Sequence, residues 1–210
     1  MSRNKLLTLI FPAFGAALIA ILSQIVIPIG TVPFTLQTLA VGLIASIFRP
    51  REATLSVALY LLLGAIGLPV FAGGSGGIAA LSGPTSGFLW GFLFYAALTS
   101  YLTNTESTLV KIFVSNLLGN CLAFICGVIS LHFLANMSWQ AAFLAGVVPF
   151  IIPEIGKLLT ITAISKPLFS STKKYCLFCI KKGVRQIKSP VEILFMSLEI
   201  KKRISSFVET

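Results

Sequence analysis

The sequence has 210 residues, of which 56% are hydrophobic and only 10% are charged, and its formal net charge is +10. Soluble globular domains carry about 25% charged residues, so this composition excludes that class and predicts an integral membrane protein. The hydrophobic runs are continuous rather than alternating, which favours membrane-spanning helices over a barrel. No soluble DNA- or RNA-binding motif accompanies the basic excess, so we do not interpret that excess as nucleic-acid binding.

Six membrane-spanning helices are predicted in chain order. The first starts with a basic segment, as a signal peptide does, but its hydrophobic run exceeds the ~7–15 residues of a signal-peptide core, so we expect a retained helix. The six predicted helices cover residues 5–27, 34–48, 53–70, 86–103, 108–134 and 147–166.

The basic residues alternate between the predicted connections. The connections at 28–33, 71–85 and 135–146 contain no Lys or Arg. The positive-inside rule therefore places these three outside and both termini in the cytoplasm. We predict an all-α, six-helix transmembrane bundle over residues 1–168, in the cell membrane of a bacterial-type cell. The basic residues that set this orientation are Arg3, Lys5, Arg49, Arg51, Lys111, Lys166, Lys173 and Lys174.

Two opposite charges interrupt the hydrophobic stretch "PFIIPEIGKLLTITA" of the sixth predicted helix. Glu154 and Lys157 are three residues apart, which puts them on one helix face. Lys166 marks the inner end of this helix, so Glu154 lies about 18 Å away, in the outer half of the membrane. A charge at the bilayer centre costs about 2.5–3.5 kcal/mol, which pairing lowers. The pair either holds helices together or anchors a ligand in a pocket, and we favour the pocket.

A helix start is predicted in "SGPTSGFLWGF", where Pro84 precedes Thr85 or Ser86 as N-cap. Its free N–H groups and positive dipole end would attract a carboxylate. The preceding segment "FAGGSGGIAALSGPTSGF" is rich in Gly; it folds over a cavity or simply forms turns between helices. These features suit a small ligand with one anionic end and one neutral hydrogen-bonding end. The aromatic candidates for its apolar part are Phe34, Tyr60, Phe71, Phe88 and Trp90.

Catalytic and metal-binding patterns are sparse. No P-loop is present, and Cys176-x-x-Cys179 supplies at most half a zinc site. His132 lies near an outer helix end, where an interfacial position is expected. An intramembrane enzyme with Glu154 as general base would lack a nucleophile–base pair. We therefore expect no enzymatic activity, no metal and no cofactor. A proton- or ion-coupled carrier of a small carboxylate-bearing solute, with Glu154 as the proton site, is the alternative to a binding subunit.

Small residues recur at four-residue spacing in the first predicted helix. Ala13, Ala17 and Ala20, with Ala16, form small-xxx-small patterns that let another helix approach closely. This other helix belongs either to the same bundle or to a partner subunit. The tail over 169–210 mixes hydrophobic residues with Lys and Arg, and we expect a basic amphipathic or partly disordered cytoplasmic segment on anionic lipid.

Four segments together resemble the BioY family, the biotin-binding S components of energy-coupling factor (ECF) transporters. They are "IPIGTVPFTLQTLAVGL", "YLLLGAIGLPVFAGGSGG", "SGPTSGFLWGF" and "PFIIPEIGK", in this order, within a resemblance that covers roughly residues 5–168. The last contains the family motif P-F-x-x-x-D-x-x-K as Pro149, Phe150, Glu154 and Lys157, with Glu in place of the usual Asp. The family's G-P-T-G-G reads Gly83-Pro84-Thr85-Ser86-Gly87.

The resemblance implies a biotin site near the outer face, beneath the loop between the first two helices. It also implies that uptake requires a transmembrane coupling subunit and two ATPase subunits, with Ala13, Ala17 and Ala20 in contact with the coupling subunit. The ureido ring of biotin is expected near Glu154 and Lys157, with its carboxylate toward the Gly-rich segment. The predicted substrate-binding residues are Glu154, Lys157, Gln37, Gly74, Ser75, Thr85, Phe88 and Tyr60.

Overall fold

The computed structural model describes the backbone of residues 3–28, 32–104 and 106–181 and the side chains of residues 10–28, 32–104 and 106–168. Two short strands form an antiparallel hairpin, β1 (Val26–Ile27) and β2 (Phe34–Thr35), and two 3-10 turns are η1 (Ala72–Gly74) and η2 (Val148–Phe150). The helices of this described part are α1 (Arg3–Ser23), α2 (Gln37–Ile47), α3 (Pro50–Ala65), α4 (Ile78–Ser82), α5 (Ser86–Leu102), α6 (Leu109–Leu134), α7 (Trp139–Gly146) and α8 (Ile151–Lys181).

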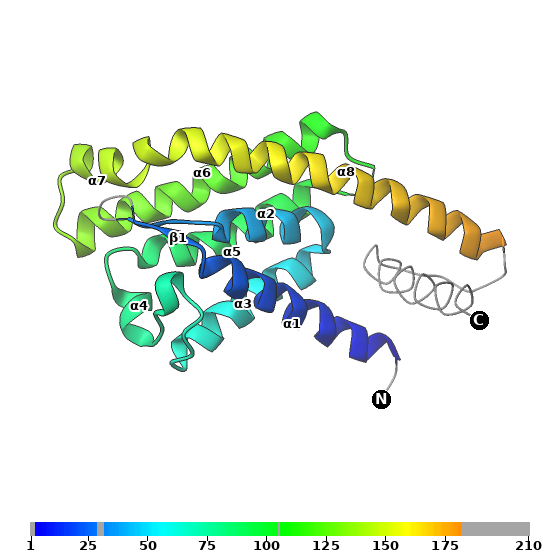
Figure 1. The fold of residues 1–210 in the computed structure, drawn as a ribbon, viewed down its shortest axis with the longest axis horizontal. Helices are drawn as coiled ribbons and strands as arrows, with labels where there is room; N and C mark the ends of the chain where they lie inside the picture. The colour runs from blue at the N-terminus through cyan, green and yellow to red at the C-terminus, as the bar shows by residue number, and fades with distance from the viewer. Residues whose placement is uncertain (1–2, 29–31, 105, 182–210) are drawn as a thin grey trace, which may run out of the picture.

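The helices pack in one bundle with α2 near its centre. The long helices α6 and α8 run side by side, and α5 packs along α6 (Figure 1). Helices α1 and α3 pack together on the other side of α2 and α5. The start of α1 and the C-terminal end of α8 lie at the same end of the bundle (Figure 1). The short helix α7 and the β1–β2 hairpin lie toward the opposite end.

Local sequence signals explain where several helices begin and end. The Thr108 Oγ1 accepts a hydrogen bond from the Lys111 backbone N–H at 3.3 Å, which caps α6, and Ser138 caps α7 in the same way. Pro50 occupies the first turn of α3, where its fixed φ suits a helix start. Gly67, just after α3, has a φ of +100°, a conformation that favours glycine and ends the helix.

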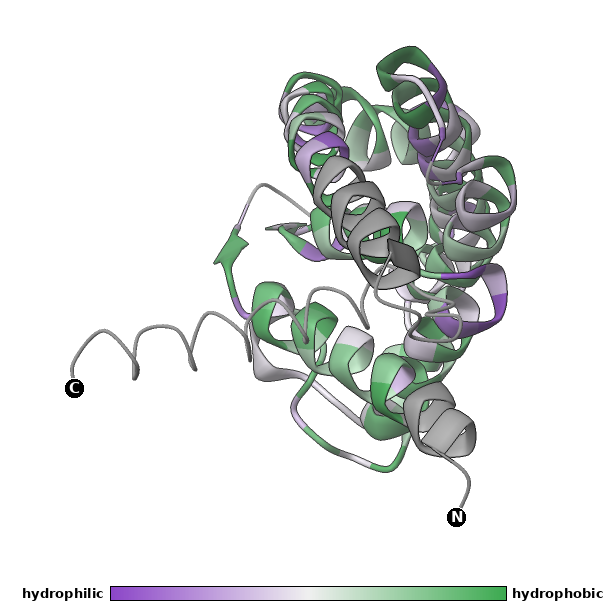
Figure 2. Cartoon of the chain, turned by 90° about the vertical axis from the view of Figure 1, so that its right-hand side faces the viewer, coloured by the Kyte–Doolittle hydropathy of each residue, from purple (hydrophilic) through white to green (hydrophobic). Residues whose placement is uncertain are grey.

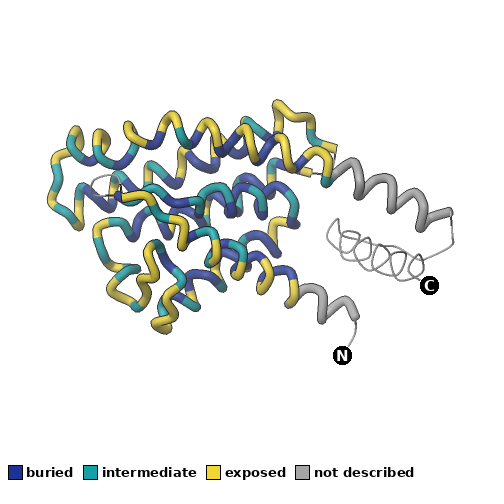
Figure 3. The backbone as a smooth tube through the Cα atoms, viewed as in Figure 1, coloured by how far each residue is buried: buried dark blue, intermediate teal, exposed yellow. Residues whose placement is uncertain are grey.

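Hydrophobic side chains cover most of the outside of the bundle. The helices are hydrophobic along most of their described length (Figure 2). On α8 the exposed positions lie along the edge away from α2, and the buried positions face the rest of the bundle (Figure 3). Both α6 and α8 carry exposed hydrophobic side chains. Exposed Ile125, Phe133, Ile152 and Leu159 are examples. Such a surface suits lipid contact.

Two segments of the described chain are long and hydrophobic enough to cross a membrane, Leu109–Leu134 and Trp139–Leu168. Ile10–Ser23, Gln37–Ile47 and Ser86–Leu102 are hydrophobic but shorter. The structure is thus mostly helical, as predicted, whereas the arrangement of six membrane spans stays a prediction.

Several predicted boundaries differ from the structure. The helix predicted over 53–70 runs from Pro50 to Ala65, because of the proline and glycine signals given above. The start of the helix predicted over 34–48 forms β2 instead, so the fold is not purely helical. Neither α4 nor α7 was predicted. Helix α8 continues past residue 168, the predicted domain boundary, to Lys181, and the remaining tail, 182–210, lies outside the described residues.

Glycines allow close packing at two places. Gly87 and Gly91 of α5 face the backbone of α6, at Cys126 and Ala123. On α3, Gly64 receives the ring of Phe71, which also meets Tyr60 edge-to-face at 5.4 Å between ring centroids. The absence of a Cβ at Gly64 therefore decides where the Phe71 ring lies.

Replacing Gly64 with Ala should destabilise the protein by about 1–3 kcal/mol, because the new methyl group would overlap the Phe71 ring. Thermal unfolding in detergent measures the effect. The matched control is Gly156→Ala on α8, where a Cβ meets nothing within 4 Å and no loss of stability is expected. Equal melting temperatures for the two variants would contradict this account of Gly64.

Candidate ligand-binding site

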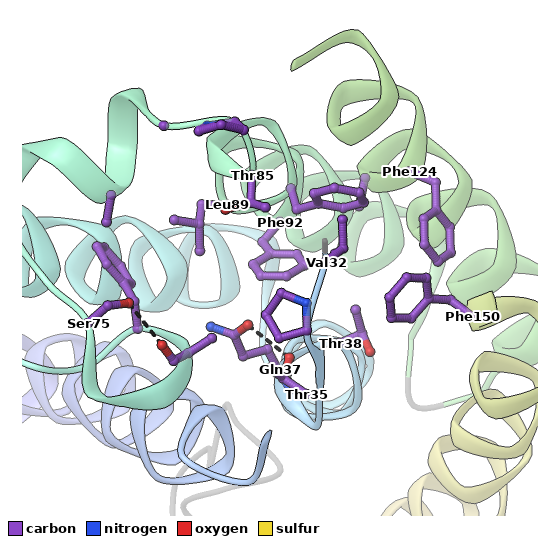
Figure 4. A pocket seen from close by; sticks show the side chains of 18 of the residues that line it. Val32, Thr35, Gln37, Thr38, Ser75, Thr85, Leu89, Phe92, Phe124 and Phe150 are labelled. Carbon is purple, nitrogen blue, oxygen red and sulfur yellow. Dashed lines mark hydrogen bonds between the residues drawn. The ribbon is translucent and has the colours of Figure 1, made fainter. Parts of the chain in front are cut away.

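A cavity of about 360 Å³ is lined by the hairpin, the segment between α3 and α5, and the helices α2, α5, α6 and α8. Residues 32–38 and 71–85 form part of its wall. Figure 4 shows Phe124 and Phe150 beside one another on one side, with Ser75 across the cavity from them. Ligand pockets in proteins are typically about 300–1,000 Å³ and mostly apolar, and this cavity has that size and character. Its aromatic wall residues are Phe71, Phe88, Phe92, Phe124 and Phe150.

The polar end of the cavity is formed by the ion pair of Glu154 and Lys157. Both side chains are buried, and the Lys157 Nζ lies 2.5 Å from the Glu154 Oε1. The same Nζ donates to the Thr38 Oγ1 at 2.8 Å and to the backbone carbonyl of Thr35 at 2.7 Å. It also lies 4.1 Å from the centroid of the Phe34 ring, a cation–π contact. Protein groups therefore accept all three ammonium protons of Lys157.

The Glu154 carboxylate receives hydrogen bonds from two other helices. Its Oε1 accepts from the Thr38 Oγ1 of α2 at 2.9 Å, and its Oε2 accepts from the Asn120 Nδ2 of α6 at 3.3 Å. A buried ion pair is tolerated when further hydrogen bonds satisfy its remaining atoms, and these contacts do so for Oε1. The pair is neutral overall, so this end of the cavity suits a neutral polar group better than a second charge.

Six of the eight predicted binding residues line the cavity. Tyr60 and Gly74 do not. The fully buried Tyr60 lies behind the wall, where its hydroxyl accepts a hydrogen bond from the Gln37 Nε2 at 2.5 Å. Gly74 belongs to η1 and has a φ of +74°, so it shapes the turn that carries Ser75 to the cavity. The six lining residues are Gln37, Ser75, Thr85, Phe88, Glu154 and Lys157.

The predicted aromatic candidates divide in a similar way. Phe71 and Phe88 line the cavity, and Phe34 lies beneath the Lys157 ammonium. Trp90 is 48% exposed on α5 and donates to the Leu81 carbonyl, away from the cavity. Thr85 immediately precedes α5, as predicted, and its side chain makes no capping hydrogen bond.

Sequence reasoning missed several polar and aromatic wall residues. Thr38 and Asn120 contact Glu154, and Phe92 and Phe124 lie in the wall. A buried Asn within a hydrophobic helix is itself a functional signal in membrane proteins. For Asn120 that signal was available, but nothing in the sequence paired it with Glu154, 34 positions away.

The small residues of α1 face in two directions. Ala13 and Ala17 are exposed and Ala20 is half-buried, whereas Ala16 is fully buried in the bundle. The pattern thus serves internal packing at Ala16 and leaves an outward face open at Ala13 and Ala17.

His132 lies outside the cavity. Its ring stacks on Trp139 at 4.0 Å between centroids, and its Nδ1 lies 2.7 Å from the Met137 carbonyl. Within the described ranges, no group of three His, Cys, Asp or Glu residues is placed to hold a metal ion. The side chains of Cys176 and Cys179 lie outside the described residues.

Comparisons with known proteins give one consistent result. The BioY family profile matches residues 1–174. The chain is 44% identical over 179 residues to the biotin transporter BioY2 of Lactococcus lactis subsp. cremoris, a match that covers 83% of this chain and 98% of that protein. It is 38% identical to the biotin transporter BioY of Thermotoga maritima over 71% of this chain and 88% of the relative.

A solved structure also matches. It is the S-component for biotin from an ECF-type ABC transporter, with a TM-score of 0.74 and 32% sequence identity. The match covers 80% of this chain and 94% of that one. The fold of the described helices is therefore similar to that of an ECF S component.

Replacing Lys157 with Met should destabilise the protein by about 3–5 kcal/mol, because it leaves the Glu154 carboxylate buried without its counter-charge. The double variant Glu154→Gln, Lys157→Met should be more stable than Lys157→Met alone, since no uncompensated charge remains. Unfolding of the single and double variants in detergent measures both effects. If the loss of unfolding free energy in the double variant equals the sum of the losses in the two single variants, the two side chains do not interact.

Proposed function

The chain belongs to the BioY family, and on this basis we propose that it binds biotin and serves biotin uptake as the S component of an ECF transporter. It is a transporter subunit and not an enzyme, and biotin is its transported ligand rather than a cofactor. The observation that carries this proposal is the mostly apolar cavity with the buried Glu154–Lys157 pair at one end.

The chemistry of biotin matches the two ends of this cavity. The neutral ureido group would lie against Glu154, because the ion pair there carries no net charge. The thioether ring and alkyl chain would contact the phenylalanine side chains of the wall. The carboxylate would lie toward Thr85 and the N-terminus of α5, where backbone N–H groups and the helix dipole favour an anion.

The residues placed around the ligand in this proposal are of two kinds. Gln37, Ser75, Thr85, Phe88, Glu154 and Lys157 would border it directly. Tyr60 and Gly74 would act from behind the wall, Tyr60 by orienting the Gln37 amide and Gly74 by shaping the turn before Ser75.

We also propose the full membrane arrangement: six spans in the cell membrane, with both termini in the cytoplasm. The alternating Lys and Arg residues support this orientation. The hydrophobic outer surface and the common position of the start of α1 and the end of α8 are consistent with it (Figure 1). The basic tail over 169–210 would then lie at the cytoplasmic surface.

The partners in this proposal are a transmembrane coupling subunit and two ATPase subunits. The name of the matching solved structure, an S-component from an ECF-type ABC transporter, supports an energy-coupling partner. Helix α1 offers a docking surface, because Ala13 and Ala17 are exposed and small enough for close helix approach. Ala20, half-buried one turn farther along, would border that surface.

Purified protein should bind biotin, measured by isothermal titration calorimetry. Dethiobiotin, which keeps the ureido group, should compete, and riboflavin should not. Glu154→Gln should weaken binding about 10- to 100-fold, because a hydrogen bond to a charged group is worth about 1.5–3 kcal/mol. The matched control is Glu106→Gln, an exposed position between α5 and α6 that does not line the cavity.

Two results would contradict this proposal. If the purified protein does not bind biotin, biotin is not its ligand. If the Glu154→Gln variant binds biotin with unchanged affinity, Glu154 is not part of the site. In cells, uptake that stops when the proton gradient collapses at constant ATP would favour the proton-coupled carrier instead.

A further inference from the structure

Asn120 is a buried polar residue of α6 with one end of its amide unused. The residue is 3% exposed and lines the cavity. Its Nδ2 donates to the Glu154 Oε2, but its Oδ1 has no hydrogen-bond partner in the described part of the chain. A buried amide oxygen without a partner is uncommon in proteins, so this atom calls for an explanation.

The orientation of this amide follows from the chemistry of its neighbour. An ionised carboxylate only accepts hydrogen bonds, so the amide nitrogen of Asn120 must face Glu154. Turning the amide over would place two acceptor oxygens against one another. The unused group is therefore the acceptor Oδ1 and not the donor Nδ2.

The Glu154 carboxylate also has an oxygen with spare capacity. Its Oε1 is occupied by the Lys157 Nζ and the Thr38 Oγ1, whereas its Oε2 accepts, among the described residues, only from Asn120. A carboxylate oxygen has room for a second hydrogen bond. Lys157 has no proton left to offer, since Glu154, Thr38 and the Thr35 carbonyl accept all three. The polar end of the cavity thus offers acceptors and no free ammonium donor.

We propose that the Asn120 Oδ1 and the Glu154 Oε2 form a paired acceptor that recognises two neighbouring N–H groups of the ligand. The Asn120–Glu154 hydrogen bond holds the two oxygens close to one another. A cyclic urea presents two such N–H groups on one small ring. This inference rests on the proposed function and deepens it, since it assigns Asn120 as a specificity-determining residue and Lys157 as the residue that positions the Glu154 carboxylate.

The test combines one variant with two ligand analogues. In each analogue one ureido N–H of biotin is replaced by an oxygen atom, giving a cyclic carbamate of nearly the same shape. The wild-type protein should bind both analogues at least tenfold more weakly than biotin, because a group built to accept a hydrogen bond is left facing an acceptor.

Asn120→Leu should weaken biotin binding about tenfold. In this variant, the analogue whose missing N–H would face residue 120 should bind as tightly as biotin does. The other analogue should still bind more weakly than biotin. Asn120→Ala gives the same comparison if the leucine variant does not fold. The matched control is Asn116→Leu, one turn away on α6, because Asn116 is fully buried, has partners at both ends of its amide and does not line the cavity. The folded Asn116→Leu variant should still bind both analogues more weakly than biotin.

Two outcomes would overturn the proposal while leaving the proposed function intact. One is wild-type affinity for biotin in the folded Asn120 variants. The other is an unchanged penalty for both analogues in those variants, which would assign recognition of the N–H groups to other atoms. Wild-type protein that does not bind biotin would instead overturn the proposed function, and the paired acceptor with it.

Discussion

The buried ion pair of Glu154 and Lys157 constrains how α2, α6 and α8 pack around the cavity. The hydrocarbon of a membrane provides no hydrogen-bond partner and no counter-charge, so the protein itself must supply partners for both charges of this pair. Lys157 meets this need by binding the Thr35 carbonyl and the Thr38 hydroxyl, and Glu154 by binding Thr38 and Asn120. One electrostatic requirement thereby fixes α8, α2 and α6 relative to one another at the end of the cavity.

The non-helical segments around the cavity are held by a second set of polar contacts. Gln37 joins the Thr35 hydroxyl to the Tyr60 hydroxyl, and so links the end of the hairpin to α3. The Ser23 hydroxyl at the end of α1 donates a hydrogen bond to the Val70 carbonyl at 2.6 Å, just before the segment 71–85. Irregular backbone in membrane proteins is tolerated where it is buried or lines a cavity, and residues of these segments line the cavity. The cavity therefore takes polar groups both from these segments, at Thr35 and Ser75, and from the helices, at Asn120, Glu154 and Lys157.

This arrangement of polar and apolar groups around the cavity fits a subunit that binds a ligand without changing it. The ion pair, the amide of Asn120 and the phenylalanine wall are suited to holding a small molecule in one orientation. Their arrangement joins α2, α6 and α8, whereas the exposed Ala13 and Ala17 belong to α1, which packs on α3 and α2, and they do not line the cavity. In the proposed transporter, ligand recognition and partner docking would thus use different faces of one bundle, which lets each be altered without direct contact with the other.

Local features of the chain were readable from the sequence because they depend on short-range geometry. The spacing of Glu154 and Lys157 predicted a pair on one helix face, and Thr85 predicted the start of α5. Four ordered segments identified the family. The predicted helix over 108–134 agrees with α6 to within one residue, since Thr108 supplies a cap. The hydrophobic composition by itself determined that the protein is a helical membrane protein.

Only the tertiary structure decided which distant residues complete the site. Asn120 lies 34 positions from Glu154, and Thr38 lies 116 positions away, so no local pattern relates them. Packing also placed Tyr60 behind the wall rather than in it, because Gln37 stands between the Tyr60 hydroxyl and Thr35. The composition and short-range spacing of a chain fix its elements and the charges they carry. The register in which the elements pack selects the few side chains that meet, and that register depends on contacts summed over the whole bundle.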